Sequence, residues 1–392
     1  MGINSNLYKM TRELDLYESF EDMDLDEKIL RGIFAYGYEK PSYIQQKAII
    51  PFINGNDIIA QAQSGTGKTA TFTISMLNNL KLEDNTMQAI ILSHTRELAL
   101  QIQNVIKNIS KFMNIRVNLS VGGTPIRDNI DELNRIPHVI IGTPGRVLDM
   151  LNKNYINRKT IRMLILDEAD ELLSRIFVNQ IYDIFRCIPS NVQVGLFSAT
   201  MTPDFFKLST QFMRDPVKVL IKNEELTLDG IRQFYIDMEK PEYKYATLCD
   251  IYSLISVSQS IIYCNSRRIV EILTRKLMDD DFSVAAIHGD MMQKDRNVIM
   301  DDFRNGVNRV LISTDLLSRG IDIQQVSVVI NYDIPQTVEN YIHRIGRSGR
   351  FGRKGLAINF ATSYDRNKIT ELEQYYSTEI PALPDLSELN VF

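Results

Sequence analysis

The feature that most constrains the fold is a regular alternation between short apolar runs and helical patterns. Each run is rich in β-branched residues, ends in small or polar residues and is followed by a segment with helical periodicity. Continuous apolar strands that alternate with helices indicate parallel sheets covered by helices on both faces. The first series of predicted strands is Asp57–Gln61, Gln88–Ser93, His138–Gly142, Met163–Leu166 and Gln193–Phe197. The second series is Ser260–Tyr263, Ser283–Ile287, Arg309–Ser313, Val326–Asn331 and Leu356–Phe360.

A polar, acidic stretch separates the two series and is the best candidate for a linker between domains. This stretch, Lys222–Gly230, reads KNEELTLDG. The chain has 392 residues, which exceeds the usual size of one domain, about 150 residues. Because ligands of parallel sheets bind at the carboxyl ends of the strands, functional residues are expected just after each run. We predict an N-terminal extension over 1–19, a first α/β domain over 20–221, a linker over 222–230 and a second α/β domain over 231–392.

Charge is distributed unevenly along the chain, whose net charge is −5. Residues 13–27 contain eight acids and no base, and residues 371–392 contain five acids and no base. Without these thirteen acids the rest of the chain carries +8. The total argues against a nucleic-acid partner, but charge assigned segment by segment does not exclude one.

Cysteine usage and hydropathy argue against two classes of protein. Cys187, Cys249 and Cys264 form neither a CxxC pair nor a cluster with the four histidines, so neither a disulfide framework nor a zinc site is indicated. Met1–Met10 lacks the apolar core of a secretory signal, and no apolar run approaches the roughly 20 residues of a membrane span. We therefore expect a soluble, cytoplasmic protein that does not associate with a membrane.

The segment after the first predicted strand has the features of a phosphate-binding loop. Its glycines free backbone N–H groups to turn toward phosphate oxygens, and the helix that follows adds the positive end of its dipole. Lys68 supplies charge for the β- and γ-phosphates, and the hydroxyl of Thr69 suits Mg²⁺. An ordinary glycine-rich turn is the alternative, and Ala62 replaces the usual first glycine of the motif. The predicted loop comprises Ala62, Gln63, Ser64, Gly65, Thr66, Gly67, Lys68, Thr69 and Ala70.

A second candidate element is a pair of acids at the end of another buried strand. Met163–Leu166 is followed by Asp167 and Glu168. Together with the hydroxyl of Thr69, Asp167 would hold Mg²⁺, partly through water, and Glu168 would orient or deprotonate an attacking water. Acids at strand ends are usually only solvated, so this assignment depends on the phosphate loop about a hundred residues upstream.

The four residues from Asp167 to Asp170 spell the DEAD tetrad, and the chain resembles the DEAD-box RNA helicases of superfamily two. The resemblance covers residues 20 to 375 and includes nearly every block expected of the family. These blocks are Thr95–Leu98, Gly122–Gly123, Thr143–Arg146, Ser198–Thr200, Asn265–Ser266, Gln293–Arg296, Ser313–Asp322 and His343–Arg350. Within the family, the chain is similar to the eukaryotic translation initiation factor four-A proteins at Ala35–Pro41, Gln180–Phe185 and Glu224–Phe234.

The resemblance implies two tandem RecA-like domains, each a mostly parallel sheet with helices on both faces, joined by a short linker. It also implies ATP and Mg²⁺ as cofactors. In the family, the aromatic residue that matches Tyr38 stacks on adenine and the glutamine that matches Gln45 hydrogen-bonds the edge of the base. An amide suits this role because it donates and accepts together. Phe20 and Lys40 belong to the same predicted base-binding element.

A basic segment of the second domain is expected to complete the ATP site. His343–Lys354 contains five bases and no acid, and on its own it would suit phosphate of any origin. The resemblance identifies Arg347 and Arg350 as arginine fingers on the γ-phosphate, which are worth about 10³ to 10⁵ in rate. It also matches Asp322 to a contact with the ribose and His343 to the residue that joins this element to the DEAD acids.

The resemblance further implies an RNA site made of hydroxyls, backbone amides and arginines. Such groups suit phosphates and 2′-OH groups and read bases poorly, so we expect RNA binding that does not depend on sequence. The family element that couples hydrolysis to unwinding matches Ser198 and Thr200, with Asp170 as their partner. The predicted RNA contacts are Thr95, Arg96, Gly123, Thr143, Arg146, Asn265, Arg296 and Thr314.

Two residues depart from the family pattern. The family has proline before the threonine of the Thr95 block, whereas this chain has His94, which we interpret as an exposed loop histidine. Ile176 occupies a position where similar proteins have glycine.

Three functional hypotheses follow from the sequence. The first is an RNA-dependent ATPase that unwinds short duplexes non-processively in translation initiation, monomeric alone and directed by scaffold proteins. The second is an ATP-locked RNA clamp that nucleates an assembly of the exon-junction type, for which a nuclear location is possible. The third is a P-loop enzyme for small molecules or DNA, against which the blocks from Thr95 to Arg146 argue.

Overall fold

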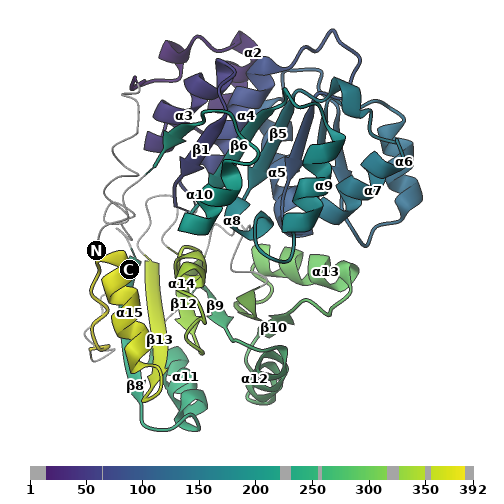
Figure 1. The fold of residues 1–392 in the computed structure, drawn as a ribbon. Helices are drawn as coiled ribbons and strands as arrows, with labels where there is room; N and C mark the ends of the chain where they lie inside the picture. Colours follow the sequence, from purple (N-terminus) through teal and green to yellow (C-terminus); the bar gives the residue numbers. More distant parts are fainter. Residues whose placement is uncertain are drawn as a thin grey trace. The chain divides into compact units, whose positions relative to one another are not determined.

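The chain forms two compact units, Met1–Lys222 and Asn223–Phe392. The computed structural model describes residues 15–63, 65–220, 231–254, 258–315, 326–348 and 355–384, which Figure 1 draws as ribbon. Residues 1–14 of the predicted extension and the whole of the predicted linker lie outside the described residues. Within the described ranges, no helix has both the length and the apolar character needed to cross a membrane.

The first unit is built on a parallel sheet, which has seven strands among its described residues, in the order β3-β4-β2-β5-β6-β1-β7. The interior strands are apolar on both sides, so each needs helices on both faces of the sheet. The strands are β1 (Ile58–Gln61), β2 (Ala89–Leu92), β3 (Val117–Ser120), β4 (Val139–Gly142), β5 (Met163–Asp167), β6 (Gln193–Ser198) and β7 (Val217–Val219).

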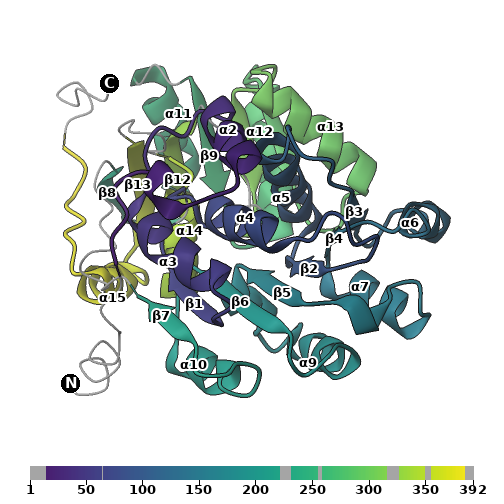
Figure 2. The ribbon, with the colours of Figure 1, turned by 90° about the horizontal axis from the view of Figure 1, so that it is seen from above.

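Helices cover both faces of this sheet and divide its core into two clusters. Helices α2 to α5 pack on one face, and helices α6 to α10 pack on the other. Figure 2 shows α4 and α5 on one side of β5 and β6, with α9 and α10 on the opposite side. The bounds are α2 (Glu27–Ala35), α3 (Tyr43–Ile53), α4 (Lys68–Asn79), α5 (Arg96–Ile109), α6 (Ile126–Leu133), α7 (Pro144–Asn152), α8 (Ala169–Leu172), α9 (Val178–Cys187) and α10 (Pro203–Ser209), with short 3-10 turns at Glu21–Met23 and Arg158–Thr160.

The second unit repeats this plan with a smaller parallel sheet, whose described strands follow the order β10-β11-β9-β12-β13-β8. Helices α13, α14 and α15 cover one face, and α11 and α12 cover the other. The strands are β8 (Ile231–Met238), β9 (Gln259–Tyr263), β10 (Val284–Ile287), β11 (Val310–Ser313), β12 (Val326–Asn331) and β13 (Gly355–Thr362). The helices are α11 (Tyr243–Leu254), α12 (Arg267–Asp279), α13 (Gln293–Arg304), α14 (Val338–Ile345) and α15 (Arg366–Tyr376). The predicted pair of parallel α/β domains is therefore confirmed.

The ten strands predicted from sequence are all present, but three others were missed: β3, β7 and β8. All three lie at the edge of a sheet. Edge strands have fewer neighbours, and here β3 and β8 each mix buried with more exposed positions. The continuous apolar run that marks an interior parallel strand is therefore absent from them.

Close packing between α2 and α5 leads to a prediction about stability. A Cβ at Gly32 would lie 1.7 Å from the backbone oxygen of Ile109, and backbone on both sides leaves no flexible atom to move aside. We expect Gly32→Ala to lower the free energy of unfolding by about 3 kcal/mol, the upper end of the usual overpacking cost. The measurement is denaturant unfolding of the full chain. Gly145→Ala is the control, because its Cβ would meet its nearest neighbour at an ordinary 3.5 Å. Equal stability of the two variants would contradict this packing.

Candidate functional site

The predicted phosphate loop lies where parallel sheets bind ligands, between the carboxyl end of β1 and the N-terminus of α4. Gly65 and Gly67 have φ angles of 87° and 95°, a left-handed conformation that glycine adopts at little cost. The hydroxyl of Thr66 donates to the backbone oxygen of Gln63 at 2.7 Å, which closes the loop on itself. Helix α4 begins at Lys68, so its first-turn N–H groups and positive dipole end lie beside the loop.

The side chain of Lys68 folds back into this loop. Its Nζ donates to the backbone oxygens of Ala62 and Gln63, at 2.6 and 3.0 Å. The side chain is only 6% exposed, so the positive charge is held inside the loop and not spread over the surface. An anion bound to the loop would meet a fixed positive charge at this point.

Gln45, predicted to read the base, contacts the phosphate loop directly. Its Oε1 accepts from the backbone N–H of Ser42 at 2.7 Å, which forms a capping box at the start of α3. Its Nε2 lies 3.5 Å from the backbone oxygen of Gly67, to which it donates. A Cβ at Gly67 would come within 2.6 Å of Gln45 Nε2, so only glycine permits this approach. The predicted base-binding element and the phosphate loop thus form one connected structure.

The other predicted base-binding residues differ in their exposure. Phe20 is fully buried in the core of the first unit, where it packs in the same cluster as Met23 and Ile29. Tyr38 is half-buried, with its ring centroid 5.2 Å from that of Tyr36. Lys40 is exposed. A fully buried Phe20 supports the element from beneath and has no face left for a ligand.

The predicted metal-binding groups come together at the neighbouring strand. The hydroxyl of Thr69, on α4, donates to Asp167 Oδ2 at 3.3 Å, and the backbone N–H of Glu168 donates to Asp167 Oδ1 at 3.0 Å. Burial and the adjacent Glu168 raise the pKa of Asp167 to about 7, while Lys68 opposes the shift. A buried carboxylate with a hydroxyl beside it is an oxygen donor set of the kind that Mg²⁺ prefers, and a cation there would favour the charged carboxylate. These residues therefore fit the implied Mg²⁺.

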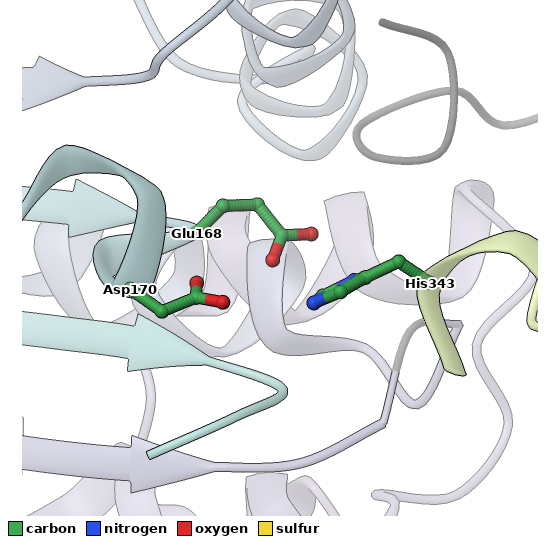
Figure 3. A group of neighbouring side chains, drawn as sticks. All are labelled: Glu168, Asp170 and His343. Atoms are coloured by element: carbon green, nitrogen blue, oxygen red, sulfur yellow. The ribbon is translucent and has the colours of Figure 1, made fainter. Parts of the chain in front are cut away.

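Glu168 occupies a strained turn between β5 and α8. Its φ and ψ angles are 50° and 54°, a left-handed conformation that costs a non-glycine residue energy and that often marks a functional site. Figure 3 shows Glu168 and Asp170 of the first unit projecting from this turn and from α8. His343, which the figure also labels, belongs to α14 of the second unit.

The predicted coupling residues are in direct contact within the first unit. The hydroxyl of Ser198 donates to Asp170 Oδ1 at 2.7 Å, and the hydroxyl of Thr200 donates to Asp170 Oδ2 at 2.5 Å. The last acid of the tetrad is therefore hydrogen-bonded through both of its carboxylate oxygens, to the last residue of β6 and to Thr200 just after the strand. A shift of either segment would be transmitted to the other.

The predicted RNA-binding residues of the first unit also cluster, around Gly122 and Gly123. The guanidinium of Arg96 lies against Gly123, whose added Cβ would meet Arg96 Nη1 at 2.1 Å. The backbone N–H of Gly122 donates to the hydroxyl of Thr143 at 3.3 Å. The hydroxyl of Thr95 accepts from the backbone N–H of Leu98 and caps α5. The blocks, although far apart in sequence, therefore form one surface.

Arg146 is held within this surface by neighbouring loop residues. Its Nη2 donates to the backbone oxygen of Thr124 at 2.9 Å, and its Nη1 donates to the hydroxyl of Thr124 and to Asn129 Oδ1. The guanidinium therefore fixes the loop that follows Gly123, and a direct role in RNA binding stays a prediction.

In the second unit, both polar atoms of the Asn265 side chain form hydrogen bonds within the protein. Its Oδ1 accepts from Arg344 at 2.7 Å, and its Nδ2 donates to the backbone oxygen of Ile334 at 2.8 Å. Thr314 is half-buried, with its backbone oxygen accepting from the hydroxyl of Ser313 at 2.9 Å. Arg296, on α13, is buried. The contacts of these residues with RNA stay predictions.

The remaining predicted residues of the ATP site are described only in part. Arg347 follows α14, and its Nε donates to the backbone oxygen of His343 at 3.1 Å. Ser64, Asp322 and Arg350 lie outside the described residues. Sequence reasoning missed Arg344, which it grouped with the other bases of this segment, whereas the structure buries it fully on α14. The available signal was its position between the apolar residues Ile342 and Ile345.

Comparison with known proteins places the chain in a family. Residues 42–208 match the model of DEAD/DEAH box helicases, and residues 243–352 match that of the helicase conserved C-terminal domain. Eukaryotic initiation factor 4A of Caenorhabditis elegans is 53% identical over 368 residues, which cover 94% of this chain and 92% of that protein. The chain belongs to the DEAD/DEAH box helicase family. This DEAD-box helicase is also 56% identical to ATP-dependent RNA helicase eIF4A of Aspergillus fumigatus over 370 residues, which cover 94% of this chain and 91% of that protein.

Solved structures agree with this assignment. Dbp5 of S. cerevisiae bound to RNA and ADP BeF3 superposes with a TM-score of 0.88 at 35% identity, covering 93% of this chain and 95% of that one. Mss116p bound to ssRNA and AMP-PNP has a TM-score of 0.86 at 28% identity, covering 96% of this chain and 82% of that one. The predicted RecA-like architecture of this DEAD-box helicase is therefore confirmed.

The two departures from the family pattern have different surroundings. His94 is half-buried, not exposed as expected from the sequence. Ile176 is 75% exposed, and nothing in the structure explains its presence there.

Proposed function

We propose that this chain acts in translation initiation, where it separates short RNA duplexes non-processively. It is an ATP-dependent RNA helicase of the DEAD-box family, and it uses a nucleotide. The observation that carries the proposal is that Lys68, Thr69 and Asp167 come together at the carboxyl ends of β1 and β5. All three of these residues belong to the first unit. The chain that contains them is more than half identical to initiation factor 4A proteins.

The ATP site assigns separate tasks to separate residues. Backbone N–H groups from Gly65 to Lys68 bind the phosphates, and the charge of Lys68 is directed to the β- and γ-phosphates. Thr69 and Asp167 would hold Mg²⁺, which neutralises phosphate charge when bound. Glu168 orients the attacking water and accepts its proton. Tyr38 and Gln45 bind the base, with Lys40 beside them and Phe20 supporting the element from the core.

The remaining ATP contacts are proposed from the family pattern. Arg347 and Arg350 stabilise charge on the γ-phosphate during transfer, and Asp322 contacts the ribose. His343 joins the segment of Arg347 to the DEAD acids. Ser64 completes the phosphate loop, flanked by Ala62, Gln63, Thr66 and Ala70.

The RNA site is proposed to read the backbone of the nucleic acid. Supporting this are the clustered hydroxyls, arginines and glycine backbone at Thr95, Arg96, Gly123, Thr143 and Arg146. These groups suit phosphates and 2′-OH groups, so binding would be independent of sequence and specific to RNA. Targeting to particular RNAs then falls to scaffold proteins, and we propose a cytoplasmic protein that is monomeric when alone.

The contact between Gly123 and Arg96 allows the RNA surface to be tested. Gly123→Ala places a Cβ 2.1 Å from Arg96 Nη1 at a φ of 71°, so the guanidinium must move. We expect RNA affinity to fall about tenfold, which is 1.4 kcal/mol, in an equilibrium binding assay. Gly122→Ala is the matched control, because its Cβ would meet Arg96 Nη2 at 3.5 Å. If both variants bound RNA like the parent, this surface would not be the RNA site.

The function itself is tested by measuring ATP turnover with single-stranded RNA, with DNA of the same length and with neither. We expect stimulation by RNA only, and release of short duplexes in the same conditions. A long-lived RNA complex that forms with ATP but does not turn over would support the RNA-clamp alternative. Turnover that is indifferent to RNA would instead indicate a P-loop enzyme with another substrate.

A further inference from the structure

A chain of hydrogen-bonded, buried side chains crosses the second unit from Gln233 on the edge strand β8 to Arg344 on α14. Arg344 Nη1 donates to Asn331 Oδ1 at 3.2 Å, and Asn331 Nδ2 donates to Asn359 Oδ1 at 2.7 Å. Asn359 Nδ2 donates to the hydroxyl of Tyr341 at 3.2 Å, which donates to Gln233 Oε1 at 2.8 Å. Gln233 is 7% exposed and the other four side chains are fully buried.

Every bond in this chain points the same way, away from the arginine. A guanidinium can only donate, so Asn331 must turn its oxygen toward Arg344 and its amino group toward Asn359. The same logic fixes the Asn359 amide, whose Nδ2 also donates to the backbone oxygen of Phe234 at 2.9 Å. Aligned hydrogen bonds polarise one another in a low-dielectric interior, so the chain has one preferred arrangement.

The position of the two asparagines is unusual for a parallel sheet. Asn331 and Asn359 are direct neighbours on β12 and β13, within ladders that are otherwise largely apolar. An apolar pair of similar volume would be as stable or more stable there, because each buried amide must first lose its hydration. Polar groups that break the pattern of a buried sheet are expected where function requires a defined arrangement.

At one end of this hydrogen-bond chain, Arg344 contacts two predicted RNA-binding segments. Arg344 Nη2 donates to Asn265 Oδ1 at 2.7 Å, and Arg344 Nε donates to Asp315 Oδ1 at 2.5 Å, next to Thr314. Its guanidinium also lies 5.3 Å from the ring centroid of Tyr263. One buried cation therefore connects the turn after β9 with the turn after β11.

A second set of contacts fixes the turn at Asn265 from the other side. Its backbone N–H donates to Asp333 Oδ2 at 3.0 Å, and Lys244 Nζ donates to Asp333 Oδ1 at 2.9 Å. Arg344 Nη1 also donates to the backbone oxygen of Asp333 at 2.7 Å. Both ends of the Asn265 amide and its backbone N–H are therefore hydrogen-bonded. Because Arg344 is the donor to Oδ1, the orientation of this side chain depends on the position of Arg344.

We propose that Asn331, Asn359 and Tyr341 are positioning residues for RNA binding. They orient Arg344, which holds the turns at Asn265 and Thr314 in the geometry that RNA requires. This inference rests on the proposed RNA-dependent function of the chain. Substitutions that break this series of hydrogen bonds are expected to weaken RNA binding, without a matching loss of ATP affinity or of the turnover rate at saturating RNA.

The test uses full-length protein and the RNA concentration that gives half-maximal ATP turnover. Tyr341→Phe removes one hydroxyl from the middle of the chain, and Asn331→Leu removes the acceptor that faces Arg344. We expect this concentration to rise about threefold for Tyr341→Phe and about tenfold for Asn331→Leu, with the maximal rate and the KM for ATP within twofold of the parent. Because the two residues act through one chain, the double variant should be no weaker than Asn331→Leu alone.

The matched control is Tyr376→Phe, which removes a hydroxyl outside the chain. Tyr376 is 4% exposed, packs near Tyr341 and donates to the backbone oxygen of Val338 at 2.8 Å. It should lower the unfolding temperature as much as Tyr341→Phe does, yet leave the RNA dependence unchanged.

The outcomes separate this inference from the proposed function. If the parent is stimulated by RNA but Tyr341→Phe behaves like Tyr376→Phe, the positioning role is wrong and the proposed function stands. Independent, multiplicative effects of Tyr341→Phe and Asn331→Leu on the RNA concentration for half-maximal turnover would also contradict the idea that the two residues act through one series of hydrogen bonds. A parent whose turnover ignores RNA would contradict both the proposed function and the inference. If Asn331→Leu does not fold, the comparison of the two tyrosine variants decides.

Discussion

Replacement of Glu168 by glutamine is expected to leave ATP binding intact and to reduce RNA-stimulated turnover by about 10³-fold. Glutamine keeps the size of the side chain but cannot accept the proton of the attacking water, and general-base catalysis contributes about 10² to 10⁴ in rate. The backbone N–H of Glu168 still donates to Asp167, so the turn is preserved. The measurement is the steady-state rate of phosphate release at saturating RNA, together with nucleotide affinity at equilibrium.

Glu171→Gln provides the matched control for this prediction. Glu171 lies three residues further along, on α8, and is half-buried, so the same chemical change is made nearby at a more exposed position. Its turnover should stay within twofold of the parent. If Glu168→Gln hydrolysed ATP as fast as Glu171→Gln does, Glu168 would not be the general base, and the strain at its left-handed turn would need another explanation.

The interior of both sheets is predictable from the sequence because both faces of each strand are buried. A strand such as β4, with every residue buried, consists of apolar residues and a terminal glycine, and such a continuous run is the signal of an interior parallel strand. Edge strands carry no such requirement. The strand β3, with the sequence VNLS, contains a buried Asn118 whose partner Glu132 comes from α6, so its polar residue is explained only by tertiary structure.

The candidate site is predictable where one local segment contains the chemistry. The phosphate loop combines a strand, two glycines, a lysine and a helix N-terminus within a few residues, and the structure shows each of them in place. The acids after β5 are equally local.

What the sequence does not reveal is which polar groups satisfy one another over long distances along the chain. Gln45 meets Gly67 across 22 residues, and Arg344 meets Asn265 across 79. Both side chains belong to motifs predicted to touch ligands, yet in the structure their polar atoms bind other parts of the protein. A residue type shows what a group can bond, but only the fold shows with what.

Lys68→Ala is expected to weaken ATP binding by about 10²-fold, in contrast to the effect at Glu168. A hydrogen bond to a charged group contributes about 1.5–3 kcal/mol, and 1.4 kcal/mol corresponds to tenfold in affinity. The side chain is already buried within the loop, where Ala62 and Gln63 accept its protons, so little ordering of the lysine is needed when phosphates bind. The measurement is the equilibrium affinity for ATP and Mg²⁺ in the absence of RNA.

Loss of Lys68 also leaves two backbone oxygens without their donor, so a structural effect must be separated from a loss of phosphate binding. Lys81→Ala is the control, because Lys81 is exposed and lies just beyond the C-terminal end of α4. This substitution removes the same charge without changing the phosphate loop. Unfolding of both variants without nucleotide measures the structural part. Stabilisation by added ATP should then be strong for Lys81→Ala and nearly absent for Lys68→Ala. Equal stabilisation of the two variants by ATP would show that the buried ammonium serves only to close the loop.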